Sequence, residues 1–312
     1  MRRAAGVALA CLGLLLASPP LTPSAATVDR PFATSSPFNT AVPAGTRTDP
    51  ASAAMVARAT RTRQLHANLV AYGIPVLTAT PSTPRHRVTC SMAAAWGPCP
   101  LTRQALPIPL DARPSTGDDG ALVVVDPATG TIGEYWQARR SGSGWTASYG
   151  AVNDLAGSGW GGSSTGAGAS RLAGVVRVRE IRAGLIPHAL VLQSDNVCAG
   201  TVRPPALKTD GTSRRTDCLP EGARLQLDPA LDLAEVPGLT PGERTVARAL
   251  QVYGGYVIDR AGTPLSASFE RAPDATASSP GAVYRAAGFG WDYDGMDAVP
   301  WHRLRVLRTW QG

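Results

Sequence analysis

The stretch that decides the fold runs from Ala121 to Arg140 and reads ALVVVDPATGTIGEYWQARR. An aliphatic run leads to Asp126, and the segment PATG at 127–130 separates it from a second run that contains aromatic residues. Glycine supplies the positive φ that a tight hairpin loop needs. The pattern therefore predicts two antiparallel strands joined by this turn.

Similar short runs follow further along the chain. They are rich in β-branched and aromatic residues and are bounded by Gly, Pro, Asn or Asp, which is typical of strands. The predicted strands cover residues 121–126, 131–140, 145–151, 188–193, 224–227, 256–259 and 265–269. Many short strands with abundant Gly and Pro predict a mainly β fold, a β-sandwich or jelly-roll-like domain with two or three peripheral helices.

Two helices are predicted clearly. Asp49 can cap the first helix and Pro50 suits its first turn. The capping box at 240–243 begins the second, which stops at Gly254. The apolar stripe predicted for the first helix extends to Tyr72 and consists of Met55, Val56, Leu65, Leu69 and Val70.

The N-terminal residues predict export. Arg2 and Arg3 precede an apolar run to about Pro19, and the small residues at 24–26 offer a cleavage site. Residues 1–26 are therefore expected to be a signal peptide, and the mature protein to be secreted and extracellular. Since no later stretch is apolar for the length of a membrane span, we expect no membrane contact after cleavage.

The mature chain is expected to be a monomer with one main body. Residues 27–50 are rich in Pro, Ser and Thr and predict an extended N-terminal arm. Residues 51–312 are long enough to bury the core of a single β-rich globular domain.

Four cysteines remain after the signal peptide, an even number that favours disulfides in an exported chain. Of the three possible pairings, Cys90 with Cys99 and Cys198 with Cys218 close short loops and are predicted. Zinc sites favour tighter Cys pairs, so we expect no metal site, and no other cofactor.

The charge pattern excludes nucleic acid as an expected partner. The sequence has 30 Lys and Arg against 23 Asp and Glu, but no like-charged block or RNA-binding motif. Nearly all the positive charge is arginine, which suits bidentate contacts with carboxylate or sulfate.

The strand after the hairpin turn has the densest chemistry. Alternation places Glu134 and Trp136 on one face, and Gln137 and Arg139 on the other. A carboxylate beside an indole suits a sugar, because the ring stacks on the aromatic while the carboxylate meets hydroxyls. The alternative is a half-buried strand with a core Trp and an exposed Glu.

Other candidates lie near strand ends, where loops gather around binding clefts. His188 enters an apolar strand and is either a catalytic or a satisfied core histidine. Asp195 follows that strand and is a candidate for substrate binding, and Asp154 follows the strand that contains Tyr149.

These residues predict a secreted carbohydrate-active enzyme that cleaves a polysaccharide, by one of two chemistries. In a lyase, Gln137 or Arg139 would neutralise a uronate carboxylate, and His188 or Tyr149 would remove the C5 proton. In a hydrolase, two carboxylates flank the bond. The best pair has Glu134 as the acid, with Asp154 or Asp126 as its partner.

The alternative is a non-catalytic glycan-binding or cell-wall-associated module. In it, Trp136, Trp145 and Trp160 would stack on sugars without turnover. Both alternatives have polysaccharide as the partner.

Three further motifs are weaker. The Gly and Ser run at 156–168 predicts a surface loop over or beside a site, with an interdomain linker as the alternative. Within it, residues 162–166 match G-x-S-x-G around Ser164, but the strand and helix of a nucleophile elbow are missing. Residues 292–297 resemble part of a calcium loop without its terminal Glu, which favours a turn.

Three stretches together resemble secreted proteins of soil actinobacteria: residues 36–43, residues 171–177 running on to 188–190, and the helix 240–253 with 257–259. These proteins form a family with no established activity. The resemblance implies one domain over most of the mature chain and supplies no catalytic residues.

Overall fold

The computed structural model describes residue 1, residues 30–162 and residues 164–308. Apart from residue 1, the predicted signal peptide lies outside the described residues. Within the described ranges, no helix has the length and apolar character that a membrane crossing requires.

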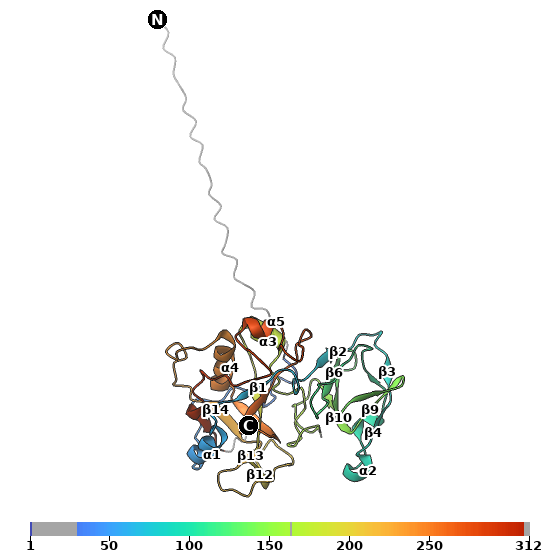
Figure 1. Ribbon diagram of the computed structural model, residues 1–312, viewed down its shortest axis with the longest axis horizontal. Coiled ribbons are helices and arrows are strands. Elements are labelled where there is room, and N and C mark those ends of the chain that lie inside the picture. The colour runs from blue at the N-terminus through green and yellow to red at the C-terminus, as the bar shows by residue number, and fades with distance from the viewer. Residues whose placement is uncertain (2–29, 163, 309–312) are drawn as a thin grey trace.

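The described chain forms two lobes that lie side by side (Figure 1). The larger lobe contains a seven-stranded sheet and most of the helices, and the smaller lobe is built almost entirely from short strands. Strands outweigh helices, so the prediction of a mainly β fold with few helices is confirmed.

The sheet of the larger lobe mixes parallel and antiparallel neighbours. Its parallel pairs are β1 with β16 and β11 with β15. In spatial order its strands are β17 (Tyr293–Asp294), β1 (His66–Asn68), β16 (Ser266–Ser268), β11 (Leu190–Ser194), β15 (Gly255–Arg260), β14 (Arg224–Leu227) and β18 (Leu304–Val306). A separate ribbon pairs β12 (Val197–Val202) with β13 (Leu219–Glu221).

The predicted hairpin forms the centre of the smaller lobe. Its strands are β6 (Leu122–Asp126) and β7 (Thr131–Trp136), flanked by β2 (Val76–Thr78) and β10 (Tyr149–Asp154). The second strand is shorter than predicted, because Gln137 has a left-handed φ of 54° that interrupts it. Small sheets pair β3 (Arg85–His86) with β5 (Leu106–Pro107), and β4 (Val88–Cys90) with β9 (Gly144–Ala147) and β8 (Arg139–Ser141).

The helix α4 (Pro241–Val252) confirms the capping-box prediction. The backbone N–H of Glu243 donates to the Thr240 hydroxyl at 3.2 Å, and the N–H of Thr240 donates to the Glu243 carboxylate at 2.8 Å. The other helices are α1 (Ser52–Ala59), α2 (Ala93–Trp96), α3 (Val178–Ala183) and α5 (Ala282–Ala286), with 3₁₀ turns at Pro100–Thr102 and Trp301–Arg303.

The first helix is shorter than the sequence predicts. α1 ends at Ala59, and Arg63 has a left-handed φ of 59°. The chain then continues into β1, where Leu65 and Leu69 are buried at its two ends. Apolar residues four apart fit either a helical face or buried positions around a short strand, so the stripe alone could not separate the two.

An apolar cluster lies where the two lobes meet. Val123 and Ile132 from the smaller lobe belong to the same buried cluster as Val191 and Tyr256 from the larger lobe. Phe38, from the N-terminal arm, is also part of it. Whether residues 51–312 fold as one domain stays a prediction, but the lobes share this core.

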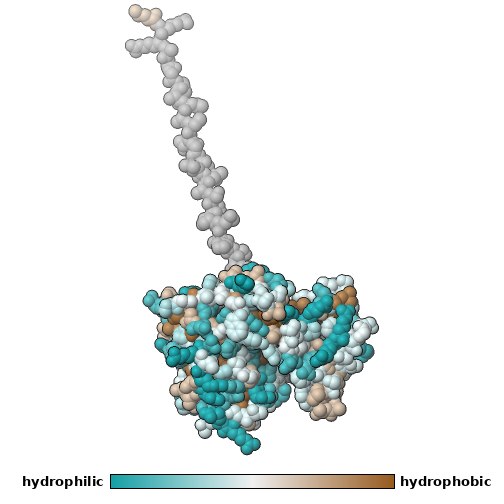
Figure 2. Space-filling view, viewed as in Figure 1, coloured by the Kyte–Doolittle hydropathy of each residue, from teal (hydrophilic) through white to brown (hydrophobic). Residues whose placement is uncertain are grey.

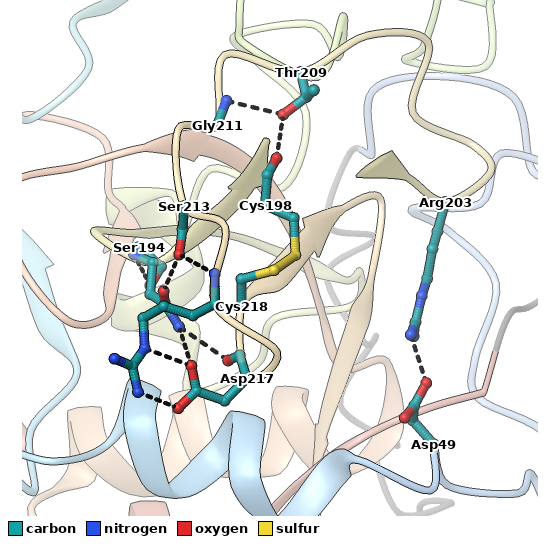
Figure 3. The surroundings of a disulfide bond; sticks show 11 residues. Asp49, Ser194, Cys198, Arg203, Thr209, Gly211, Ser213, Asp217 and Cys218 are labelled. Carbon is teal, nitrogen blue, oxygen red and sulfur yellow. Dashed lines mark hydrogen bonds and ion pairs between the residues drawn. A yellow bond between two sulfur atoms is a disulfide. The ribbon is translucent and has the colours of Figure 1, made fainter. Parts of the chain in front are cut away.

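Both predicted disulfides are present, Cys90 to Cys99 and Cys198 to Cys218. Around the second bridge, the Thr209 hydroxyl donates to the carbonyl of Cys198 at 3.3 Å and accepts from the N–H of Gly211 at 2.9 Å (Figure 3). The bridge and these bonds hold the 209–211 loop against β12.

Candidate functional site

Glu134 lies on β7 with none of its surface exposed to solvent. Its carboxylate accepts hydrogen bonds from the hydroxyls of Ser164 and Ser170, and from the backbone N–H of Arg171 at 2.8 Å. Burial raises the pKa of Glu134, and these donors act in the opposite direction. The carboxylate is thus enclosed by protein donors.

The second half of the glycine-rich segment is buried, which corrects the prediction of a surface loop at 156–168. Ser164 and Thr165 are 6 % and 5 % exposed, and Ala167 and Ser170 are fully buried. The segment is buried because Ser164 within it and Ser170 just after it supply the hydroxyls that bind Glu134. Composition suggested a solvated loop because the sequence does not show which buried acceptors the serines meet.

Three carboxylates meet beside Gly166 of this segment. Asp210 comes from the disulfide-linked loop, Glu221 from β13 and Asp259 from β15, and one oxygen of each lies within 4.8 Å of the others. We call these three residues the carboxylate cluster. Asp259 accepts a 2.9 Å hydrogen bond from the backbone N–H of Gly166.

Burial and mutual repulsion disfavour the charged forms of the carboxylates in this cluster. Burial raises the pKa of Glu221, and the negative charges of Asp210 and Asp259 raise it further, while hydrogen bonding to Thr209 and to the backbone of Asp210 acts in the opposite direction. Burial also raises the pKa of Asp259, where the positive charge of Arg171 acts in the opposite direction. Neighbouring carboxylates of this kind share protons or hold a cation.

Arg171 links this region to the smaller lobe. Its guanidinium donates to the carbonyl of Ser164 and lies 3.9 Å from the Asp119 carboxylate. Asp119 in turn accepts a 3.0 Å hydrogen bond from the indole N–H of Trp136. Trp136, predicted as a sugar platform, is therefore half-buried and held in place.

An aromatic group surrounds Trp136. Trp96, at the end of α2, stacks on Trp136 with ring centroids 5.4 Å apart and planes 23° apart. Tyr149 meets Trp96 edge-on at 5.6 Å, and its hydroxyl donates to the carbonyl of Pro98. Trp96 is 54 % exposed, so it presents indole surface to solvent. Figure 2 shows mildly hydrophobic atoms at this end of the smaller lobe.

A polar cavity of about 500 Å³ adjoins the aromatic group. Gln137 and Arg139, both predicted to bind substrate, line it together with Ser91 and Ser148. The Ser148 hydroxyl donates to the Gln137 side chain at 2.6 Å. Gln137 directly follows Trp136 and Ser148 directly precedes Tyr149, so residues that line the cavity are chain neighbours of residues in the aromatic group. We call the cavity and the stacked rings together the aromatic-polar face.

The remaining predicted residues lie elsewhere. His188 is buried against α3, with its Nε2 3.1 Å from the Glu180 carboxylate and its Nδ1 2.9 Å from the Ala189 carbonyl. Asp195 forms an ion pair with Arg61. Asp154 accepts a hydrogen bond from a backbone N–H two residues on. Within the described ranges, Glu134 and His188 share no hydrogen-bond partner.

In the possible calcium loop at 292–297, backbone N–H groups of the protein bind the carboxylates of Asp292 and Asp294. Asp292 accepts from three consecutive backbone N–H groups, those of Leu69, Val70 and Ala71. Asp294 accepts from the N–H of Met296. The segment is a turn that anchors β17 beside β1, as its missing ligands indicate.

Sequence reasoning did not predict two features of the candidate site, the carboxylate cluster and the exposed Trp96. The carboxylate cluster joins residues 11 to 49 positions apart with no recognisable metal-ligand spacing, so only the fold brings them together. Trp96 follows three alanines between Cys90 and Cys99, and the short loop closed by this disulfide was the one available signal that the indole is held at the surface.

Comparisons with family models, curated proteins and solved structures found no match to this chain. They leave the resemblance to secreted actinobacterial proteins as a prediction.

Proposed function

We propose that the protein is a secreted polysaccharide-binding protein, and that it binds glycan chains on the aromatic-polar face of the smaller lobe. One observation carries the proposal: the exposed indole of Trp96 is stacked on Trp136 beside a polar cavity. A protein of this kind is the non-catalytic glycan-binding module that the sequence leaves as the alternative to an enzyme.

The chemistry of this face suits a sugar chain. The apolar side of a pyranose ring packs on an exposed indole, and Trp96 is fixed for that contact by the ring beneath it and by Tyr149. The neighbouring cavity offers hydroxyl, amide and guanidinium groups that can bind sugar hydroxyls. Arg139, which is exposed, can also pair with the carboxylate of a uronate.

Polysaccharide cleavage gains no support from the residues chosen for it. Glu134 is fully buried and its carboxylate is held by three protein donors. His188 is 4 % exposed and is paired with Glu180. A general acid or base must come within hydrogen-bond reach of the substrate, and neither side chain is exposed in the way that this requires.

Affinity electrophoresis in gels that contain neutral or uronate-rich polysaccharides tests the proposal. Retardation by at least one polysaccharide is expected, with Trp96→Ala weakening it about tenfold, a loss of one stacking contact. Trp291→Ala is the matched control, because Trp291 is 55 % exposed and also contacts a tyrosine ring edge-on, but lies in the larger lobe. Equal losses in both variants, or no retardation by any polysaccharide, would contradict a binding role for this face. New reducing ends or unsaturated uronates would instead support the hypothesis that the protein is a polysaccharide-cleaving enzyme.

A further inference from the structure

We propose that Asp210, Glu221 and Asp259 form a binding site for one calcium ion, independent of the aromatic-polar face. One oxygen from each carboxylate lies within 4.8 Å of the others. Any two oxygens bound to one Ca²⁺ ion lie at most about 4.6 to 5.2 Å apart, because each lies about 2.3 to 2.6 Å from the ion. The three side chains can therefore share one ion without large movements.

Backbone groups orient each carboxylate. Asp210 accepts a 3.1 Å hydrogen bond from the N–H of Arg260, and Asp259 accepts one of 2.9 Å from the N–H of Gly166. Glu221 accepts one of 3.2 Å from the N–H of Asp210. These bonds fix the three side chains before any ligand arrives, which reduces the entropy lost on binding.

A second observation points to a ligand. Glu221 is fully buried, and its Oε1 atom has no hydrogen-bond partner within the described part of the chain. Leaving a buried carboxylate oxygen without a donor or cation is costly, so native proteins rarely do it. A cation bound between the carboxylates would satisfy this oxygen.

The unpartnered oxygen faces the rest of the cluster. A Cβ atom built on Gly166 would lie 2.5 Å from Glu221 Oε1 and 2.7 Å from Asp210 Oδ1. The two oxygens therefore converge above the same glycine, where a side chain would collide with both. Gly166 thus keeps open the space into which the carboxylates point.

The donor set selects the kind of cation. All three side chains offer hard oxygen ligands, which suit Ca²⁺ or Mg²⁺ rather than zinc, whose sites favour nitrogen and sulfur. Calcium tolerates the irregular geometry of ligands from three separate segments, whereas Mg²⁺ demands a near-ideal octahedron. Asp210 is exposed and gives the ion a route from solvent, where water molecules can complete its coordination.

The experiment uses the mature protein treated with EGTA and dialysed, with calorimetric titration and thermal unfolding in CaCl₂ or MgCl₂ at constant ionic strength. We expect about one Ca²⁺ per chain, and a melting temperature several degrees higher at saturation because the ion binds only the folded state. Glu221→Gln should abolish both signals. Without calcium it should melt no lower than the parent, because it removes charge repulsion within the cluster.

Two further variants make the test specific. Gly166→Ala retains all three carboxylates but fills the space between them, so it should weaken calcium binding at least tenfold. Glu235→Gln, the same chemical change at an exposed position, should bind calcium like the parent. The site is overturned if the parent shows neither heat nor a melting shift with calcium, or if Glu221→Gln retains them. A response to Mg²⁺ without one to Ca²⁺ overturns the choice of calcium.

Discussion

The backbone N–H of Arg171 donates a 2.8 Å hydrogen bond to the carboxylate of Glu134, and thereby joins the chain just after the glycine-rich segment to β7 of the smaller lobe. The hydroxyls of Ser164, within that segment, and of Ser170, just after it, bind the same carboxylate. Glu134 is therefore the acceptor around which this part of the lobe junction is organised.

Glu134→Gln should destabilise the protein by about 2–4 kcal/mol, because the new amide NH₂ faces donors and one buried acceptor is lost. Urea unfolding at neutral pH measures this loss. Ser170→Ala, which removes one donor to Glu134 and the acceptor of the Leu172 N–H, should cost about 1 kcal/mol. A Glu134→Gln protein as stable as the parent, but altered in its action on glycans, would contradict the structural role and favour the catalytic one.

The bridge between Cys198 and Cys218 should affect calcium binding as well as stability. Replacing both cysteines by serine should cost about 3 kcal/mol, since the bridge spans 20 positions. Calcium affinity should also fall, because the 209–211 loop that carries Asp210 is held to Cys198. Replacing Cys90 and Cys99 is the matched control. It should lower the melting temperature but leave calcium affinity, measured by calorimetry, unchanged.

The local parts of this fold follow from the sequence because their causes are local. The capping box around Thr240 and the turn at 127–130 each involve a few adjacent residues, and the predicted strand at 224–227 matches β14. The disulfides were predictable because short loops limit the pairing.

The parts that sequence reasoning missed depend on contacts between distant segments. Leu65 and Leu69 fit a helix until β16 is seen to pair with β1. Ser164 and Ser170 appear solvated until Glu134 is placed beneath them. The carboxylate cluster likewise exists only after β13, β15 and the disulfide-linked loop are packed together.

His188 should make stability depend on pH. Burial lowers the pKa of its imidazole, but the charge and hydrogen bond of Glu180 outweigh burial, with Arg177 opposing them, so the pKa is raised. A raised pKa in the folded state stabilises the protein below the unfolded value, about 6.5, and this contribution disappears as pH rises through the folded value.

The stability difference between the parent and His188→Gln should therefore be larger at pH 6 than at pH 9, as measured by urea unfolding at both values. Glu180→Gln should reduce this dependence, because it removes the charge that favours the imidazolium. His302→Gln, at an exposed histidine, is the control and should leave the dependence unchanged. A difference that grows with rising pH would mean that folding lowers the pKa of His188, so that burial outweighs Glu180.

Trp96 and Trp136 should contribute to glycan binding as one unit, with different effects on stability. Trp96 is mostly exposed, so Trp96→Ala should weaken binding about tenfold while the melting temperature barely changes. Trp136 supports Trp96 and donates its indole N–H to Asp119, so Trp136→Ala should weaken binding as much and also destabilise the protein by about 2 kcal/mol. Because Trp136 acts on the sugar through Trp96, the double variant should bind no worse than Trp136→Ala alone. Titrations of the parent, the two single variants and the double variant with the same polysaccharide measure this. Additive losses in the double variant would show that the two indoles bind sugars independently, and a Trp136→Ala protein that is less stable but binds normally would restrict Trp136 to the core.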